Sequence, residues 1–157
     1  SLMKINLISI ESSRPEWTQK AFNSYESKFN KSINITWTGC KPVLRSKNYN
    51  VPSVVEEESI LLLSKVKKGD LIISLDKEGS NLSSEKLRVN FDNWVATSRD
   101  IAFIIGGPDG LSRNVIKQSD FCWSLSNLTF PHSIVPVVVI EQMFRVWSIT
   151  QNHPYHR

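Results

Sequence analysis

The chain has 157 residues, about the length of one ordinary domain. Hydrophobic residues make up 40% of it and charged residues 22%, a balance typical of a soluble globular protein that needs no disulfide or metal to build its core. The longest apolar runs, at 101–105 and 137–140, fall far short of the ~18–20 residues of a membrane span. A miniprotein scaffold and a membrane-spanning protein are therefore excluded.

Charge and cysteine usage narrow the expected partners. Nineteen Lys and Arg against fifteen Asp and Glu give a formal charge of +4, which makes a polyanionic partner plausible. Cys40 and Cys122 lie far apart, without CxxC or Cys/His spacing, so we expect neither a disulfide nor a metal site. No cleavage site follows the apolar run at 3–10, so we expect no signal peptide and a cytoplasmic protein.

Short β-branched runs alternate with longer amphipathic runs, which is the pattern of βαβ units. We therefore expect an α/β fold with a mostly parallel sheet flanked by helices, as a single domain over residues 3–157, with residues 1–2 a remnant of cloning. Strands are expected at residues 4–10, 33–38, 70–75, 101–105 and 122–125.

Two capping boxes predict where the first two helices begin. Ser13 with Glu16, and Pro15 in the first turn, predicts one helix; Ser53 with Glu56 predicts another that runs to about residue 66. Further helices are expected at residues 83–96, 111–119 and 133–150. The buried stripe of the first helix is expected to contain Trp17, Ala21, Phe22, Tyr25 and Phe29.

Residues 41–50 show neither the helical nor the strand spacing of apolar residues, and they include Lys41, Arg45 and Lys47. This combination predicts a mobile basic loop; the alternative is a loop that is merely solvated. The acidic run at 56–58 is expected to be a favourable first helical turn.

The strongest local signal is a buried-type strand that runs into the glycine-rich sequence GGPDGLS at 106–112. Gly106, Gly107 and Gly110 would let the backbone approach a ligand closely, although a purely structural turn fits equally. The spacing is neither GxGxxG nor GxxxxGK[ST], so a Rossmann or P-loop site is excluded. A second stretch, WSLSNLTFPH at 123–132, mixes hydrogen-bonding and apolar groups, as a small-ligand loop or a capped strand-to-helix loop would.

The tail NHPYHR at 152–157 is dense in groups for proton transfer, stacking and phosphate binding, whereas chain ends usually carry no function. His153 and His156 would need a helix to bind a metal together, and Pro154 opposes one.

These stretches, with Leu75-Asp76 and RVWSIT at 145–150, resemble the SPOUT-class ribosomal large subunit methyltransferase H (RlmH) group over nearly the whole chain. The resemblance implies a C-terminal trefoil knot, an obligate homodimer and S-adenosyl-L-methionine as cofactor. It also implies methylation of N3 of a pseudouridine in 23S rRNA on the assembled 70S ribosome. Family members tend to have arginine and tyrosine where this chain has Pro136 and Phe144. The cofactor residues implied by the resemblance are Leu75, Gly106, Leu125, Ser126, Asn127, Leu128, Thr129 and Phe130.

For the chemistry we expect His132 or His156 as the base, Tyr155 to stack on or orient the target base, and Arg145 and Arg157 to hold phosphate or the developing negative oxygen. The alternatives are a catalytically silent ribosome-binding SPOUT module and a protein that binds another nucleotide at the glycine turn. The last helix is apolar on more than one face, at Val137, Val138, Ile140, Met143, Phe144 and Trp147. Coverage by a second subunit would explain this, and burial within its own subunit is the alternative.

Overall fold

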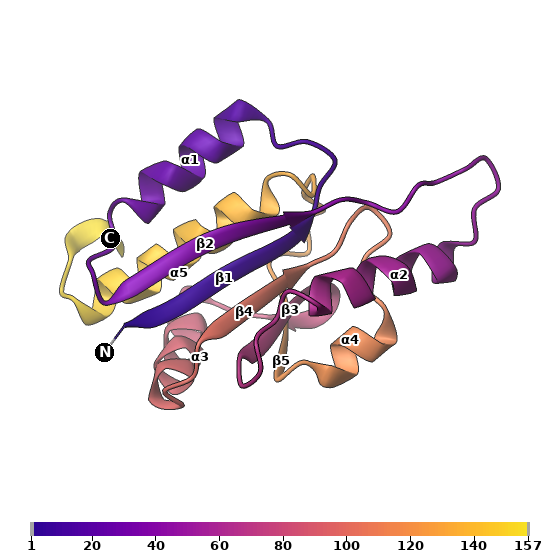
Figure 1. The fold of residues 1–157 in the computed structure, drawn as a ribbon. Helices are drawn as coiled ribbons and strands as arrows, with labels where there is room; N and C mark the ends of the chain where they lie inside the picture. The colour runs from indigo at the N-terminus through magenta and orange to yellow at the C-terminus, as the bar shows by residue number, and fades with distance from the viewer. Residues whose placement is uncertain (1, 157) are drawn as a thin grey trace.

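A single sheet of five parallel strands organises the protein, in a computed structural model that describes residues 2–156. The strands are β1 (Met3–Ile10), β2 (Ile33–Cys40), β3 (Leu71–Asn81), β4 (Ile101–Ile105) and β5 (Phe121–Ser124), in the order β2-β1-β4-β3-β5 (Figure 1). All four strand pairs are parallel, so the predicted sheet is confirmed. The trefoil knot stays a prediction.

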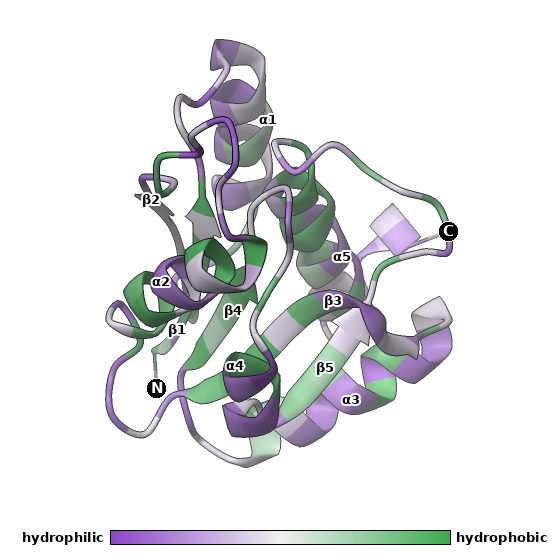
Figure 2. Ribbon diagram, turned by 90° about the vertical axis from the view of Figure 1, so that its right-hand side faces the viewer, coloured by the Kyte–Doolittle hydropathy of each residue, from purple (hydrophilic) through white to green (hydrophobic). Residues whose placement is uncertain are grey.

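Helices cover both faces of the sheet, so every residue of the central strand β4 is buried. On one face α5 (Val135–Thr150) packs between α1 (Glu16–Glu26) and α3 (Ser84–Ala96). On the other face lie α2 (Val51–Leu63) and the short α4 (Arg113–Gln118). Figure 2 shows β4 in green among helices that carry both green and purple segments. Within residues 2–156, no helix has the length and apolar character to cross a membrane.

The start of the first helix differs from the prediction. Helix α1 begins at Glu16 with Pro15 as its N-cap residue, and no side chain caps it. A residue before proline is kept out of the helical region, so Arg14 cannot belong to the first turn that Ser13 was expected to cap. Of the expected buried stripe, Phe22 is buried and Tyr25 and Phe29 pack against the core, whereas Trp17 is 55% exposed and Thr18 is buried instead.

The second capping box is also wrong. Helix α2 begins at Val51, and the side chain of Asn50 accepts a hydrogen bond from the Ser53 N–H at 2.9 Å. Asn50 can cap here because Pro52 in the first turn needs no partner for a backbone N–H. The acidic run at 56–58 therefore lies beyond the first turn, and Glu58 is buried.

Ile140, Met143, Phe144 and Trp147 of α5 are buried within the same chain, whereas Val137 and Val138 stay partly exposed. Met143, Phe144 and Trp147 belong to one core cluster with residues of α1, α3 and the sheet. The aromatic ring of Phe144 packs edge-on against Phe29 at 5.3 Å between centroids. Burial within its own subunit, the alternative given above, thus accounts for the buried positions, and they supply no independent argument for a dimer.

Candidate functional site

The glycine-rich turn after β4 closes on itself at the carboxyl end of the sheet. The N–H of Gly110 donates to the carbonyl of Gly107 at 3.0 Å, and Gly110 has a φ of 80°. A Cβ on Gly106 would lie 2.7 Å from the carbonyl of Gly110, so no other residue fits there without opening the turn. The backbone of this turn is therefore held in a fixed, closely folded shape.

The residues expected to bind the cofactor lie at one end of three neighbouring strands. Leu75 pairs in register with Ile105 of β4 and with Trp123 of β5, so the turn after β4 and the loop after β5 leave the sheet on either side of it. In this second loop Leu125, Ser126 and Phe130 are partly buried, whereas Asn127, Leu128 and Thr129 are exposed.

The loop after β5 is shaped by its own hydrogen bonds. The Leu128 N–H donates to the Ser126 hydroxyl at 3.0 Å, and the Asn81 side-chain amide donates to the Ser124 carbonyl at 3.1 Å. The Leu128 side chain is 73% exposed, which is unusual for a large apolar residue. These loops thus offer backbone polar groups beside an unpartnered apolar side chain, as a site for an amphiphilic small molecule does.

Arg45 ties the loop after β2 to the glycine-rich turn. Its guanidinium donates to both oxygens of Glu58, at 2.8 and 3.0 Å, and its Nε donates to Asp109 at 3.0 Å. Glu58 also accepts the Val43 N–H at 3.0 Å, and the Tyr49 hydroxyl donates to Asp109 at 3.1 Å. The hydrogen bonds to Glu58, followed by that to Asp109, raise the pKa of Arg45 above its ordinary value despite partial burial. The predicted mobile basic loop is thus fastened at Arg45.

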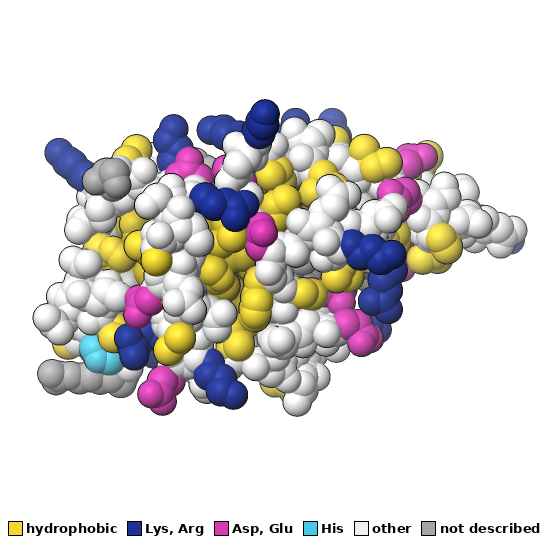
Figure 3. Space-filling model, turned by 90° about the horizontal axis from the view of Figure 1, so that it is seen from below, with side chains coloured by type: hydrophobic (Ala, Val, Ile, Leu, Met, Phe, Trp, Pro, Cys, Tyr) yellow, Lys and Arg dark blue, Asp and Glu magenta, His cyan; other side chains and the backbone are white. Residues whose placement is uncertain are grey.

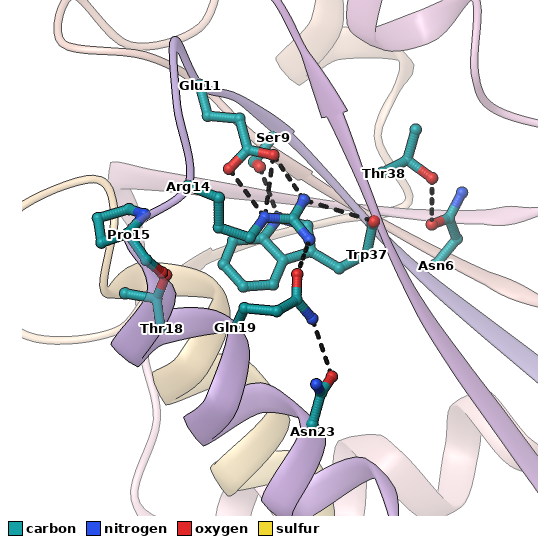
Figure 4. Close-up of polar contacts among 10 residues, drawn as sticks. All are labelled: Asn6, Ser9, Glu11, Arg14, Pro15, Thr18, Gln19, Asn23, Trp37 and Thr38. Carbon is teal, nitrogen blue, oxygen red and sulfur yellow. Dashed lines mark hydrogen bonds and ion pairs between the residues drawn. The ribbon is translucent and has the colours of Figure 1, made fainter.

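A second fixed carboxylate stands where β1 ends (Figure 4). Arg14 Nε lies 3.1 Å from each oxygen of Glu11, and the guanidinium carbon stacks 3.6 Å from the ring centroid of Trp37. The Trp37 indole N–H donates to the Ser9 hydroxyl at 2.8 Å, which fixes the ring. A Cβ on Gly39 would lie only 1.9 Å from a Glu11 oxygen, so the carboxylate occupies space that only a glycine leaves free.

A cavity of about 370 Å³ opens between the Arg45 and Glu11 ion pairs. It is lined by the end of β1, the loops after β1 and β2, the glycine-rich turn and the segment before α5; its lining residues are Ile10, Glu11, Ser12, Pro42, Val43, Leu44, Arg45, Pro108 and His132. Of the expected catalytic residues that the structure describes, His132 alone lines this cavity, and it is exposed.

Arg145, Tyr155 and His156, three more of the expected catalytic residues, lie toward the opposite end of α5. The Tyr155 hydroxyl donates to Glu141 at 2.8 Å and lies 3.0 Å from the Tyr25 hydroxyl, while Arg145 pairs with Glu141 at 2.8 Å. Burial, and then the bonds to Tyr25 and Glu141, raise the pKa of Tyr155. His156 is exposed beside this cluster, and Arg157 lies outside the described residues.

The helix between them keeps His132 and the tail apart. Helix α5 has sixteen residues, which at about 1.5 Å per residue is about 24 Å long. Figure 1 shows the tail, in yellow, at the end of the sheet where β1 and β2 begin, far from the glycine-rich turn. A single chain therefore does not bring Tyr155 and His156 to His132.

Sequence reasoning missed the carboxylates that shape this region. Glu58 follows Val54 and Val55 and precedes Leu62 on the buried side of α2. An ionisable residue at such a core position predicts a buried charged partner, and this signal points to the arginine in the preceding loop. Glu11 gave no comparable signal: its partner Arg14 is only three residues away, and Gly39 comes next to it only through the pairing of β1 with β2.

Comparisons with known proteins agree over the full length. The model of a family described as predicted SPOUT methyltransferase matches residues 3–156. The chain is 37% identical over 155 residues to ribosomal RNA large subunit methyltransferase H of Hydrogenovibrio crunogenus, with 99% of each chain covered. It is 35% identical over 155 residues to the protein of the same name in Thioalkalivibrio sulfidiphilus, again with 99% of each covered.

A solved structure described as a "putative methylase family protein from Neisseria gonorrhoeae" shares the fold. The two chains are 14% identical, with a TM-score of 0.50 over 90% of this chain and 82% of the other. The full-length match to the family model and the identity to both relatives establish the kinship: the chain belongs to the ribosomal RNA large subunit methyltransferase H family of SPOUT methyltransferases.

Proposed function

We propose that this protein uses S-adenosyl-L-methionine to methylate N3 of a pseudouridine in 23S rRNA within the assembled 70S ribosome, in the cytoplasm. The observation that carries the proposal is the full-length similarity to two methyltransferases named for large-subunit ribosomal RNA. The two loops at the carboxyl end of the sheet, which coincide with the residues expected to bind the cofactor, support it.

These loops fit the cofactor. Because Gly106 has no Cβ, the turn folds back onto the Gly110 carbonyl and keeps one fixed shape, and the exposed Leu128 offers an apolar contact for a purine ring. Leu75, Gly106 and the run at 125–130 would hold the molecule through backbone groups and apolar side chains. When bound, S-adenosyl-L-methionine supplies an electrophilic methyl group on its sulfonium.

The protein's task is then to place the ring nitrogen and to deal with its proton. N3 of pseudouridine lies between two carbonyl groups and carries a hydrogen, so the proton must leave and negative charge gathers on the flanking oxygens. A histidine, His132 or His156, takes that proton in our proposal. Tyr155 stacks on or orients the base, and Arg145 and Arg157 stabilise phosphate or the developing negative oxygen.

These roles require two chains. Because α5 holds His132 and the tail about 24 Å apart, the tail of one subunit must complete the cofactor end of the other, in a homodimer whose chains are knotted in the family's manner. In the view of Figure 3, apolar side chains gather in the middle of one face with basic and acidic ones around them, as at many subunit interfaces. Sedimentation at low concentration tests this, since a stable monomer would contradict it.

The decisive assay is transfer of a labelled methyl group from S-adenosyl-L-methionine to 70S ribosomes that lack the modification. We expect label in 23S rRNA at N3 of one pseudouridine, and little label in free 23S rRNA. If the cofactor does not bind in calorimetry and no label appears, the chain is a silent ribosome-binding module instead.

A further inference from the structure

The cavity of about 370 Å³ at the ends of β1, β2 and β4 lies outside the residues assigned to the cofactor. We propose that it receives the target base, turned out of the rRNA, with Glu11 as a hydrogen-bond acceptor for the N1–H of that base, which does not react, so that N3 stays open to the methyl group. This inference rests on the proposed function, because it assigns a place to the substrate of that reaction. Enzymes that act on a ring atom commonly take the base out of its stack into such a pocket.

The cavity lies next to both expected cofactor loops. Pro108 belongs to the glycine-rich turn, and His132 follows the run at 125–130 by two residues. Both line the cavity, so a ring inside it would lie beside the cofactor end and within reach of the proposed base. The volume is at the small end of the roughly 300–1,000 Å³ of ligand sites, as a single base requires.

The charges around the cavity favour a neutral ligand over a phosphate. Arg45 is neutralised by Glu58 and Asp109, and Glu11 is paired with Arg14. Two guanidinium groups thus face three carboxylates, which leaves no net positive charge for an anion. A pyrimidine base is uncharged, with N–H donors and carbonyl acceptors along its edge, and it matches this balance.

Polar groups for that edge are already in place. The Glu11 carboxylate has lone pairs left beyond its bonds to Arg14, and the four hydrogen bonds of Arg45 leave one of its five N–H groups free for a carbonyl. Ile10, Pro42 and Val43 provide apolar surface for the ring faces. Because Glu11 and Arg45 are fixed by other side chains, the ligand need not order them on binding.

The phosphates would lie outside the cavity. Lys41 and Lys47, in the loop that forms one wall, are exposed, and no ion pair to either is found among the described residues. Such side chains suit contacts to the backbone of an RNA strand whose base points inward.

The test places a tryptophan side chain in the cavity from either of two lining positions. We expect Ser12→Trp and Val43→Trp each to lower kcat/KM for methyl transfer to ribosomes by about a hundredfold, since the reacting ring would be displaced. Glu11→Gln keeps the shape but weakens the acceptor, and it should lower kcat/KM about tenfold. The Kd for S-adenosyl-L-methionine, measured by calorimetry, should stay within about twofold of wild type in all three variants.

The matched control uses a second cavity, at the opposite end of the sheet. Asn34 is exposed and lines that cavity of about 260 Å³, so Asn34→Trp introduces the same ring away from the cofactor end. Its kcat/KM should equal that of wild type. Gly39→Ala offers a second way to displace the Glu11 carboxylate without changing its charge, and it should reproduce the effect of Glu11→Gln.

Two failures are distinguishable. Wild-type protein that transfers no methyl group to ribosomes overturns the proposed function. Active wild type with Ser12→Trp and Val43→Trp variants that are folded and equally active overturns the assignment of the cavity, and so does a loss of cofactor affinity that accounts for the whole loss of activity. Thermal melting identifies a tryptophan variant that fails to fold, and Glu11→Gln and Gly39→Ala then decide.

Discussion

Arg45 and Glu58 form a bidentate pair, in which the guanidinium donates to both carboxylate oxygens while Glu58 is only 1% exposed. A buried carboxylate of this kind is tolerated because its charge is matched and its oxygens are satisfied. Through the further bond to Asp109, the same guanidinium fixes the glycine-rich turn next to the loop after β2. Stability and site geometry therefore depend on one side chain.

Removal of Arg45 should be costly. Arg45→Ala leaves Glu58 buried without a partner, and we expect a loss of about 3–5 kcal/mol in the free energy of unfolding, measured by urea denaturation with tryptophan fluorescence. Arg45→Met combined with Glu58→Leu should recover most of the loss, because no charge is left buried. Arg88→Ala is the control, since the exposed pair of Arg88 with Asp92 should contribute less than about 1 kcal/mol. A loss below about 1 kcal/mol for Arg45→Ala would contradict this account.

Gly106 should be needed for the cofactor end and not for folding in general. In Gly106→Ala the new Cβ meets the Gly110 carbonyl, so the turn must open, and we expect at least a tenfold rise in the Kd for S-adenosyl-L-methionine, about 1.4 kcal/mol, by calorimetry. Gly69→Ala is the matched control: Gly69 has a φ of 91° with no neighbour near its Cβ position, so alanine costs stability through backbone strain alone. Cofactor affinity should not change in Gly69→Ala.

Tyr155 should make stability depend on pH in the alkaline range. Its folded-state pKa is raised, so the fold favours the protonated phenol; the stabilisation is complete below the ordinary pKa of about 10 and is lost as pH rises toward the raised value. Tyr155→Phe should lower the free energy of unfolding by about 1 kcal/mol near neutral pH and reduce its decline above about pH 10. Equal declines in both proteins, followed by denaturant unfolding across this range, would refute the assignment.

The composite site can be tested by mixing subunits. We expect Gly106→Ala and Tyr155→Ala homodimers each to lose methyl transfer, because each lacks one half of every site. Co-expressed heterodimers carry one site in which an intact cofactor end meets an intact tail, and they should regain up to about half of the wild-type activity. Heterodimers no more active than the better parent would show that both groups must come from the same chain.

Periodicity predicted the class and the strands well, because short buried strands and amphipathic helices differ in their apolar spacing. Helix starts were harder: in α1 the restriction that Pro15 places on Arg14 outweighed the Ser13 signal, and in α2 Asn50 with Pro52 displaced Ser53. Both capping boxes matched the sequence pattern, but in each case a competing preference of neighbouring residues determined where the helix begins.

The sequence predicted the segments that form the candidate site, but not how those segments contact one another. The stretches at 106–112 and 123–132 stood out because glycine and hydrogen-bonding residues follow strand patterns, and the family resemblance then pointed to Gly106 and the run at 125–130. The pairing of Arg45 with Glu58 and Asp109 depends on residues up to 64 positions apart, and it follows from the strand order β2-β1-β4 rather than from local composition. The separation of His132 from Tyr155 likewise appears only once α5 is seen to run the length of the sheet.

The length of helix α5 sets the distance between His132 and the C-terminal tail in the proposed dimer. One inserted residue would shift the tail by about 1.5 Å and turn it by about 100° around the helix axis, so Tyr155 would face away from the subunit that it serves. Substitutions within α5 can be absorbed by repacking, but a change in its length cannot. We therefore expect the number of residues between His132 and Tyr155 to be far less tolerant of insertion or deletion than the number in the loop at 41–50.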